Sequence, residues 1–225
     1  MQNLFEFYSR WNFKRRVSRV VRKGIPLRLN LGAGGTNYPG WISAERYEFD
    51  LTKPTAFSDT FVKDAISNVL AEHVIEHIYR KDFELFLHKI RPFMKPDSVI
   101  RIAVPDAWHP SAYVRELTKP GGLEPGADDH KEFYSFEVMK DVAARSKFDL
   151  RPVEWFDESG SFHYEDDDWS NGYIARSRKN YAGRFTSSPE EHKRMLESVP
   201  DHLREQFFKL EMSYTSLIVD FKISI

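Results

Sequence analysis

The sequence predicts an α/β fold built around a mostly parallel sheet, and three observations lead to this class. Leu27–Leu31 is a short apolar run that ends directly in the glycine cluster Gly32–Gly35. Ser98–Val104 is almost continuously apolar, as a central parallel strand is. Between them, Asp82–Phe93 has apolar residues at helical spacing. In doubly wound folds, a strand that runs into a glycine loop forms a nucleotide site at the carboxyl end of the sheet.

The other elements follow from periodicity and capping. Trp41–Glu45 predicts a second short strand, and Asn68–Ile78 begins as an apolar strand and passes into a polar turn that contains histidine. The helix over Asp82–Phe93 is expected to stop at Pro96. The C-terminal half adds a helix capped by Ser135 and strands at Phe148–Phe156 and Tyr214–Ile223.

Composition limits the class of protein. The 225 residues fit one domain, or one domain with a sizeable insertion, and 41% of them are hydrophobic. There is no cysteine, which excludes disulfides and thiolate metal sites. No run approaches the ~18 apolar residues of a spanning helix, and the N-terminus lacks the apolar core of a signal peptide. We therefore expect a cytoplasmic protein.

The charge is unevenly distributed. Residues 1–23 hold seven basic residues and one acid, so this segment carries +6 and the remainder −7 of the net −1. Its apolar residues recur at helical spacing, which predicts a basic amphipathic helix. That helix packs on the domain with a solvated basic face, or it contacts an anionic membrane surface, or it binds an anionic substrate. Nucleic acid is disfavoured because no recognised binding motif accompanies the charge.

The glycine cluster predicts a nucleotide site only together with the carboxylate that follows it. A Gly-x-Gly-Gly turn alone also fits an ordinary strand-to-helix connection. Glu45 lies about ten residues further on, at the end of the second predicted strand, where a carboxylate accepts hydrogen bonds from the ribose of a nucleoside. The dinucleotide pattern G-x-G-x-x-G and its ~20-residue spacing to an acid are absent, which argues against an NAD-dependent oxidoreductase.

Taken in order, these segments resemble the class I S-adenosylmethionine (SAM)-dependent methyltransferases. They look most like a bacterial subgroup of predicted methyltransferases often associated with surface-polysaccharide genes. In that subgroup the strands read L-N-L-G-C-G-G, P-G-W-I-N-V-D, D-L-T-K-P, S-E-H-V-I-E-H and L-K-P-G-G-x-L-R-I-x-V-P-D. The match runs from Leu27 to Asp106 and resumes at His130–Tyr134 and Tyr214–Asp220.

The resemblance implies a Rossmann-like fold and SAM as cofactor. The expected sheet has seven strands, mostly parallel with an antiparallel last strand, and helices on both faces. The chain departs from the family at four places, one of them an insertion of about four residues between Asp59 and Asn68. Asn30 replaces the usual acid, Glu45 replaces Asp, and Pro96-Asp97-Ser98 replaces Pro-Gly-Gly. The departure at Asn30 leaves the contacts to the methionine end of SAM open.

The cofactor site implied by the resemblance contains nine residues. They are Asn30, Gly32, Ala33, Gly34, Gly35, Glu45, Asp50, Glu72 and His73. Asp50 equally fits an Asx turn at a strand end. His73 and His77 are spaced as two metal ligands on a helix would be, but the expected third ligand is absent, so we expect no metal site.

Methyl transfer to a hydroxyl needs a base, because an alcohol is a poor nucleophile at neutral pH. The candidates are His130, His163, Asp106 and His73. We favour His130 and His163, which match positions that recur in the resemblance. A solvated loop histidine is the alternative for each.

The long connection before the last strand predicts an insertion on the substrate side. We expect residues 24–225 to form the methyltransferase domain and 157–212 to be this insertion, with a helix capped at Ser188–Glu191. The segment Asp106–His130 is expected to be a second loop over the same edge. Trp169 and Tyr173 in the insertion fit either a sugar-stacking surface or anchors in the core.

We therefore expect O-methylation of a small-molecule, saccharide or glycolipid acceptor, with the acceptor class taken from the family association. A non-catalytic SAM-binding partner or regulatory subunit is the alternative, and a nucleic-acid methyltransferase is disfavoured. A homodimer and a peripheral contact with the inner membrane through the N-terminus are further expectations.

Overall fold

A computed structural model describes residues 2–53, 55–166, 169–178, 188–209 and 215–223. Its seven strands form one sheet in the order β2-β1-β3-β4-β7-β5-β6. Their bounds are β1 Leu27–Leu31, β2 Ile42–Ala44, β3 Ile66–Glu72, β4 Met94–Val104, β5 Phe148–Phe156, β6 Phe162–Tyr164 and β7 Leu217–Ile223. Tyr214, the first residue of the expected strand Tyr214–Ile223, and Met212, the end of the insertion, fall outside the described residues.

Strand directions confirm a mostly parallel sheet with an antiparallel last strand. The pairs β1–β2, β1–β3 and β3–β4 are parallel. β7 lies antiparallel between β4 and β5, so β5 runs in the same direction as β4. The strand at the far edge of the sheet is the short β6, which comes from the predicted insertion and pairs antiparallel with β5.

The described α-helices are α1 Gln2–Arg22, α2 Thr55–Ser58, α3 Arg80–Ile90, α4 Ala112–Thr118, α5 Phe136–Ser146 and α6 Pro189–Glu197. They include the four that the sequence predicts, α1, α3, α5 and α6, and two that it does not, α2 and α4. Short 3-10 helices occur at Ile75–His77, Arg91–Phe93, Ala127–Asp129 and Asp201–Lys209. Pro96 does not stop α3, because the helix ends at Ile90 and Pro96 lies inside β4, where the pairing register with β3 shifts. Asp106–His130, expected as a loop, contains α4.

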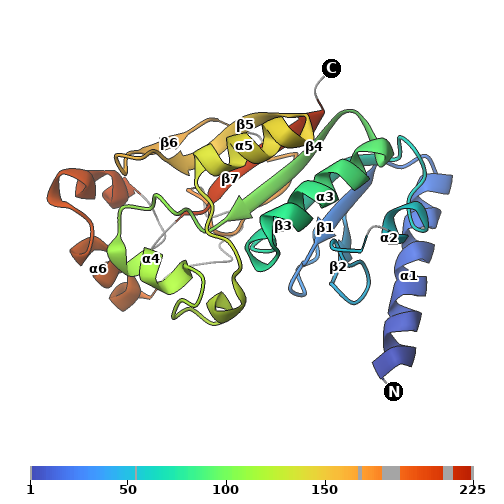
Figure 1. The fold of residues 1–225 in the computed structure, drawn as a ribbon, viewed down its shortest axis with the longest axis horizontal. Coiled ribbons are helices and arrows are strands. Elements are labelled where there is room, and N and C mark those ends of the chain that lie inside the picture. Colours follow the sequence, from blue (N-terminus) through green and yellow to red (C-terminus); the bar gives the residue numbers. More distant parts are fainter. Residues whose placement is uncertain (1, 54, 167–168, 179–187, 210–214, 224–225) are drawn as a thin grey trace.

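Helices are expected on both faces of the sheet, but among the described residues the helices that pack on the sheet, α1, α3 and α5, lie on one face. Figure 1 shows α3 and α5 side by side in front of the sheet and α1 at the end near β2. Alternate residues of the central strands pack under these helices, together with Phe13 and Val17 of α1. The hydrophobic cluster on the opposite face contains no helical residue.

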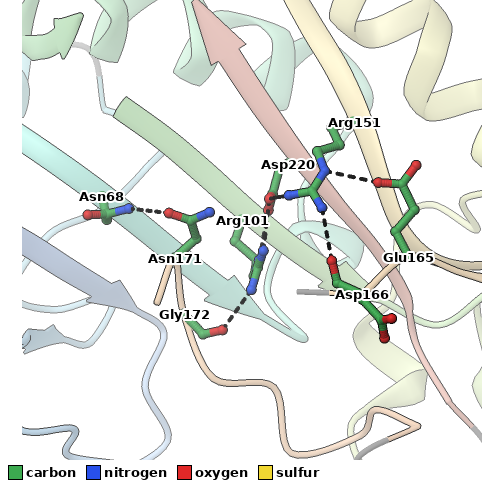
Figure 2. Close-up of polar contacts among 8 residues, drawn as sticks. All are labelled: Asn68, Arg101, Arg151, Glu165, Asp166, Asn171, Gly172 and Asp220. Carbon is green, nitrogen blue, oxygen red and sulfur yellow. Dashed lines mark hydrogen bonds and ion pairs between the residues drawn. The ribbon is translucent and has the colours of Figure 1, made fainter. Parts of the chain in front are cut away.

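Residues 169–178 of the insertion cover that opposite face. Trp169 and Ile174 pack on Leu70 of β3 and Ala103 of β4, and Tyr173 packs on Tyr38. Trp169 is 4% exposed, so it anchors the insertion in the core and is not a sugar-stacking surface. Polar contacts shown in Figure 2 add to this: Asn68 donates to Asn171, and Arg101 donates to the carbonyl of Gly172.

A satellite cluster joins the two loop segments at the other end of the sheet. It contains Val114 of α4 with Met195 of α6, Val199 and Phe207, packed on Phe156 at the end of β5. Figure 1 shows α4 and α6 together at this end, opposite α1. The capping box predicted at Ser188 is confirmed, since its Oγ accepts from the Glu191 N–H and the Glu191 carboxylate accepts from the Ser188 N–H.

Only some of the apolar residues of α1 are buried. Phe13 and Val17 are in the core, whereas Leu4, Phe7 and Tyr8 remain more than half exposed and Trp11 is 44% exposed. Arg16 fixes the helix to the sheet by donating to the Ser43 carbonyl and to Glu48. None of the described helices is long and apolar enough to cross a membrane.

Candidate functional site

Two adjoining cavities open at the carboxyl ends of β1, β2 and β3. One, of about 570 Å³, lies between the glycine loop, the end of β3 and residues 124–130, with Ala175 and Arg176 of the insertion. The other, of about 760 Å³, extends from Glu45 and Asp50 toward Tyr79 and Lys131. Gly32, His73 and His77 line both, so they mark the boundary between the two.

The glycine loop requires glycine for two separate reasons. Gly32, Gly34 and Gly35 have φ of 61°, 54° and 80°, a region that residues with a side chain rarely adopt. At Gly32 a Cβ would also lie 2.4 Å from Cγ2 of Val74. At Gly34 a Cβ would meet no atom within 4 Å, so the chain leaves open space beside a backbone that lines the cavity.

Glu45 stands directly after β2 and faces the glycine loop. Its Oε1 accepts a 3.3 Å hydrogen bond from the Gly35 N–H, and the residue lines the second cavity. Glu48 holds the Glu45 backbone through a 3.1 Å bond to its N–H and is itself bound to Arg16 of α1. The N-terminal helix therefore braces the turn that carries Glu45.

Asp50 combines the two uses expected for it. Its Oδ1 accepts from the N–H and the hydroxyl of Thr52, which is the Asx-type turn, and the residue also lines the second cavity. Burial alone would raise the pKa of Asp50, but the hydrogen bonds from Thr52 and the charges of Arg46 and Lys53 lower it. Asp50 is therefore a fixed carboxylate at the cavity wall.

The end of β3 connects the cavity to the insertion and to β7. Oε1 of Glu72 accepts from the N–H groups of Ala175 and Arg176 at 2.7 and 3.1 Å. His73 has φ 53°, and its Nε2 lies 3.1 Å from the Ser216 hydroxyl. A non-glycine residue in this conformation is held by its surroundings, and such residues gather at functional sites.

His130 reaches the same wall from a distant segment. Its ring packs edge-on against His77, with centroids 4.7 Å apart, and its Nδ1 lies 2.7 Å from the Thr118 carbonyl. Burial lowers the pKa of His77, an effect that the charge of Glu76 opposes. The side chains of Glu76, His77 and His130 lie with one potential ligand atom of each within 4.8 Å of the others. His73 and His77 do not share a helix, because His73 follows a strand and His77 ends a 3-10 turn.

Four predicted site residues, Asn30, Asp106, Gly35 and His163, line neither cavity. Asn30 is buried behind the glycine loop and donates to the Thr36 carbonyl at 3.5 Å. Asp106 is buried, and its two oxygens accept from the N–H groups of Trp108 and Phe156. Burial raises the pKa of Asp106 to about 7 although both bonds favour the charged form. Gly35 lies outside the cavity walls and donates its N–H to Glu45.

His163 also lies apart from the cavities. Its ring stacks on Trp155 at 5.1 Å, and its Nε2 is 2.6 Å from Oδ2 of Asp157. Burial alone would raise the pKa of Asp157, but hydrogen bonds from Ser159 and His163 lower it to about 2. The predicted roles of Asn30, Asp106 and His163 stay predictions.

Arg176 and Glu124 are cavity residues that the sequence analysis missed. Both line the first cavity, and the Arg176 guanidinium contacts the Glu124 carboxylate, which joins the insertion to the 119–130 loop. The Glu124-Pro125-Gly126 sequence is a turn signal that could have marked the loop tip. Nothing local marks Arg176.

Comparison with known proteins adds a likeness of fold. A scan against protein-family models and a sequence search of curated proteins gave no match. A SAM-dependent methyltransferase structure from Archaeoglobus fulgidus aligns over 99% of this chain and 100% of its own, with 15% identity and a TM-score of 0.46.

Two further solved structures give similar values. A putative methyltransferase in complex with the Haloferax volcanii Trm112 activator covers 89% of this chain and 83% of its own, at 10% identity and a TM-score of 0.47. A possible histamine N-methyltransferase from Thermotoga maritima covers 75% and 95%, at 14% identity and 0.42. These scores lie below 0.5, so the functional conclusion rests on the site itself.

Proposed function

We propose that the protein is a SAM-dependent methyltransferase. The observation that carries the proposal is the juxtaposition of the glycine loop and Glu45 at the carboxyl ends of adjacent parallel strands, beside two joined cavities. This is the place where open α/β sheets bind nucleotides. The open space beside Gly34 fits a ligand that approaches the backbone closely.

The proposed arrangement places the nucleoside in the second cavity and the methionine end in the first. Glu45 accepts hydrogen bonds from the ribose hydroxyls, and the loop at Gly32–Gly34 follows the methionine moiety. The reactive methyl then lies near the boundary marked by His73 and His77. The acceptor enters from the first cavity, whose wall includes His130 and Arg176.

The reaction is an in-line displacement. The acceptor oxygen forms a bond to the methyl carbon, the carbon–sulfur bond breaks, and its electron pair stays on sulfur to give S-adenosylhomocysteine (SAH). The hydroxyl proton needs an acceptor at this wall. Among the candidate bases, His130 and His73 line the cavity, whereas Asp106 and His163 do not. The polar walls support a hydroxylated small molecule or saccharide as acceptor, the class that the family association suggests.

Calorimetry with SAM, SAH and NAD tests the proposal. SAM and SAH are expected to bind with one site per chain, and NAD is expected not to bind. Binding of NAD without SAH would overturn the proposal. Binding of SAH with no methyl transfer from labelled SAM to any of a panel of hydroxylated acceptors would favour the alternative, a non-catalytic SAM-binding partner.

A further inference from the structure

We infer that Glu76, His77 and His130 bind a divalent transition-metal ion in the wall shared by the two cavities. The three side chains come from two separate segments, the 3-10 turn Ile75–His77 and the residue that directly follows the 3-10 helix Ala127–Asp129. One potential ligand atom of each lies within 4.8 Å of the others. In a tetrahedral site, donors about 2.0–2.2 Å from the ion are about 3.3–3.6 Å apart, so the three side chains would close by up to about 1.5 Å to complete the set.

The environment of the Glu76 carboxylate favours a bound cation. It is 1% exposed, and neither carboxylate oxygen has a hydrogen bond of normal geometry among the described residues. Nδ1 of His73 lies 3.0 Å from Oε1 of Glu76. A buried carboxylate without such bonds is costly, and coordination to a metal is one of the ways proteins compensate it.

Two basic side chains from the segments around Glu76 are paired with other acids. The guanidinium of Arg80 binds Glu132 at 3.2 Å. The ammonium of Lys131 binds Asp129 at 2.6 Å, although its backbone N–H donates to the Glu76 carbonyl. Because these pairs occupy both cations, the histidines around Glu76 are the groups left to balance the negative charge of its carboxylate.

His130 is held in the tautomer that a metal requires. A carbonyl oxygen only accepts hydrogen bonds, so Nδ1 of His130 carries the proton in the 2.7 Å bond to Thr118. Its Nε2 is therefore the nitrogen with a lone pair. Metal-binding histidines are oriented in this way, by donating the other ring N–H to a carbonyl or carboxylate. For His77 the corresponding group is Asp129, whose Oδ2 lies 3.7 Å from Nδ1.

The donor set selects the class of ion. Two imidazoles and one carboxylate suit zinc and its first-row neighbours, whereas magnesium and calcium prefer oxygen ligands throughout. Three protein ligands also leave a coordination position open, as in catalytic zinc sites. His77 and His130 line the first cavity, so that position faces the space assigned to the methyl acceptor.

The consequence for catalysis rests on the proposed function, whereas metal binding itself does not. An acceptor hydroxyl bound to the ion has a lowered pKa and loses its proton more readily. His130 would then be a metal ligand and not the general base.

Cobalt(II) is a suitable probe because its visible absorption reports ligation directly. The full chain, freed of metal with EDTA, is titrated with Co²⁺ by absorption and by calorimetry. We expect one ion per chain, displaced by Zn²⁺ and not by millimolar Mg²⁺. Glu76→Gln, His77→Ala and His130→Ala should each weaken Co²⁺ binding at least ~10-fold. His88→Ala, an exposed histidine of α3, is the matched control and should bind Co²⁺ as the wild type does.

SAH binding, measured on the same samples, separates this inference from the proposed function. Absence of Co²⁺ binding to a chain that binds SAH would overturn the metal site alone. Co²⁺ binding without SAH binding would support the metal site and count against the methyltransferase. Equal Co²⁺ affinity of wild type and His130→Ala would also overturn the site, and that variant changes a partly exposed loop residue, so it tests the inference even if Glu76→Gln fails to fold.

Discussion

Arg101 of β4 and Asp220 of β7 form a two-bonded ion pair that is completely buried. Nε lies 2.7 Å from Oδ1 and Nη2 lies 2.8 Å from Oδ2, and both side chains are 0% exposed. The pair joins neighbouring strands on the face that the insertion covers, and Arg101 also donates to the Gly172 carbonyl (Figure 2). It therefore couples the sheet to the segment that contributes Ala175 and Arg176 to the first cavity.

Removing one partner of this pair should destabilise the fold severely. Asp220→Ala leaves a buried guanidinium without its carboxylate, so we expect a loss of about 3–5 kcal/mol in the free energy of unfolding. Arg151→Ala, which removes a partly exposed cation 3.8 Å from Asp220, should cost no more than about 1 kcal/mol. Urea denaturation followed by circular dichroism measures both. The double variant Arg101→Met/Asp220→Leu should recover much of the loss, and a double variant as unstable as the sum of its parts would contradict this account.

Glu45→Ala should weaken SAM binding without unfolding the protein. The expected loss is roughly 1–3 kcal/mol, because hydrogen bonds to a charged group are left unmade. Calorimetry with SAH measures it, and Glu137→Ala on the exposed face of α5 is the control. An unchanged affinity in a folded Glu45→Ala variant would remove this residue from the site.

Asp106 should make stability depend on pH in an unusual direction. Its pKa in the folded protein is raised from 3.8 to about 7, so between these values the folded chain keeps a proton that the unfolded chain has lost. The contribution of Asp106 to the free energy of unfolding therefore falls as pH rises from about 4 to 7, and it is constant above pH 7. Comparing wild type with Asp106→Asn by denaturation at several pH values isolates this contribution. A difference that instead grows with pH would mean that the two backbone N–H bonds outweigh burial.

The sequence predicts best where neighbouring residues decide the structure. β1 matches its predicted bounds, β5 does too, and the Ser135 and Ser188 caps form as expected, because apolar runs and capping act locally. The Arg101–Asp220 pair could not be anticipated, since 119 positions separate its members and each alone looks like a surface charge. The same holds for the meeting of His77 with His130, which depends on how residues 106–130 fold back on β3. Residues 169–178 cover one face of the sheet by packing on Leu70 and Ala103, and this too is a tertiary contact that local sequence does not predict.

The two favoured histidines should separate by function. His130 lines the first cavity and His163 is bound to Asp157 at the β6 edge. His130→Ala should reduce methyl transfer by ~10²–10⁴ with SAH affinity nearly unchanged, whether His130 takes the acceptor proton itself or holds the metal ion that lowers the pKa of the acceptor hydroxyl. His163→Ala should keep turnover within a few-fold of wild type. Single-turnover kinetics with labelled SAM measure the difference, and the reverse order of effects would show that the acceptor lies near β6.

The exposed half of α1 should bind anionic surfaces. Leu4, Phe7 and Trp11 are exposed on a helix within a segment of charge +6, and this combination favours the interface of an anionic bilayer. Deleting the helix would remove Phe13, Val17 and the bond from Arg16 to Glu48, so substitution is the cleaner experiment. Leu4→Ser/Phe7→Ser/Trp11→Ser should reduce sedimentation with phosphatidylglycerol vesicles at least ~10-fold while thermal stability and SAH affinity stay unchanged.

Phe208→Ser, an equally exposed aromatic remote in sequence from α1, is the control. Wild-type binding should also weaken as salt rises, because part of the attraction is electrostatic and screened over about 10 Å at 0.1 M. If the wild type does not sediment with these vesicles at low salt, α1 serves only to brace β2 and the turn that carries Glu45.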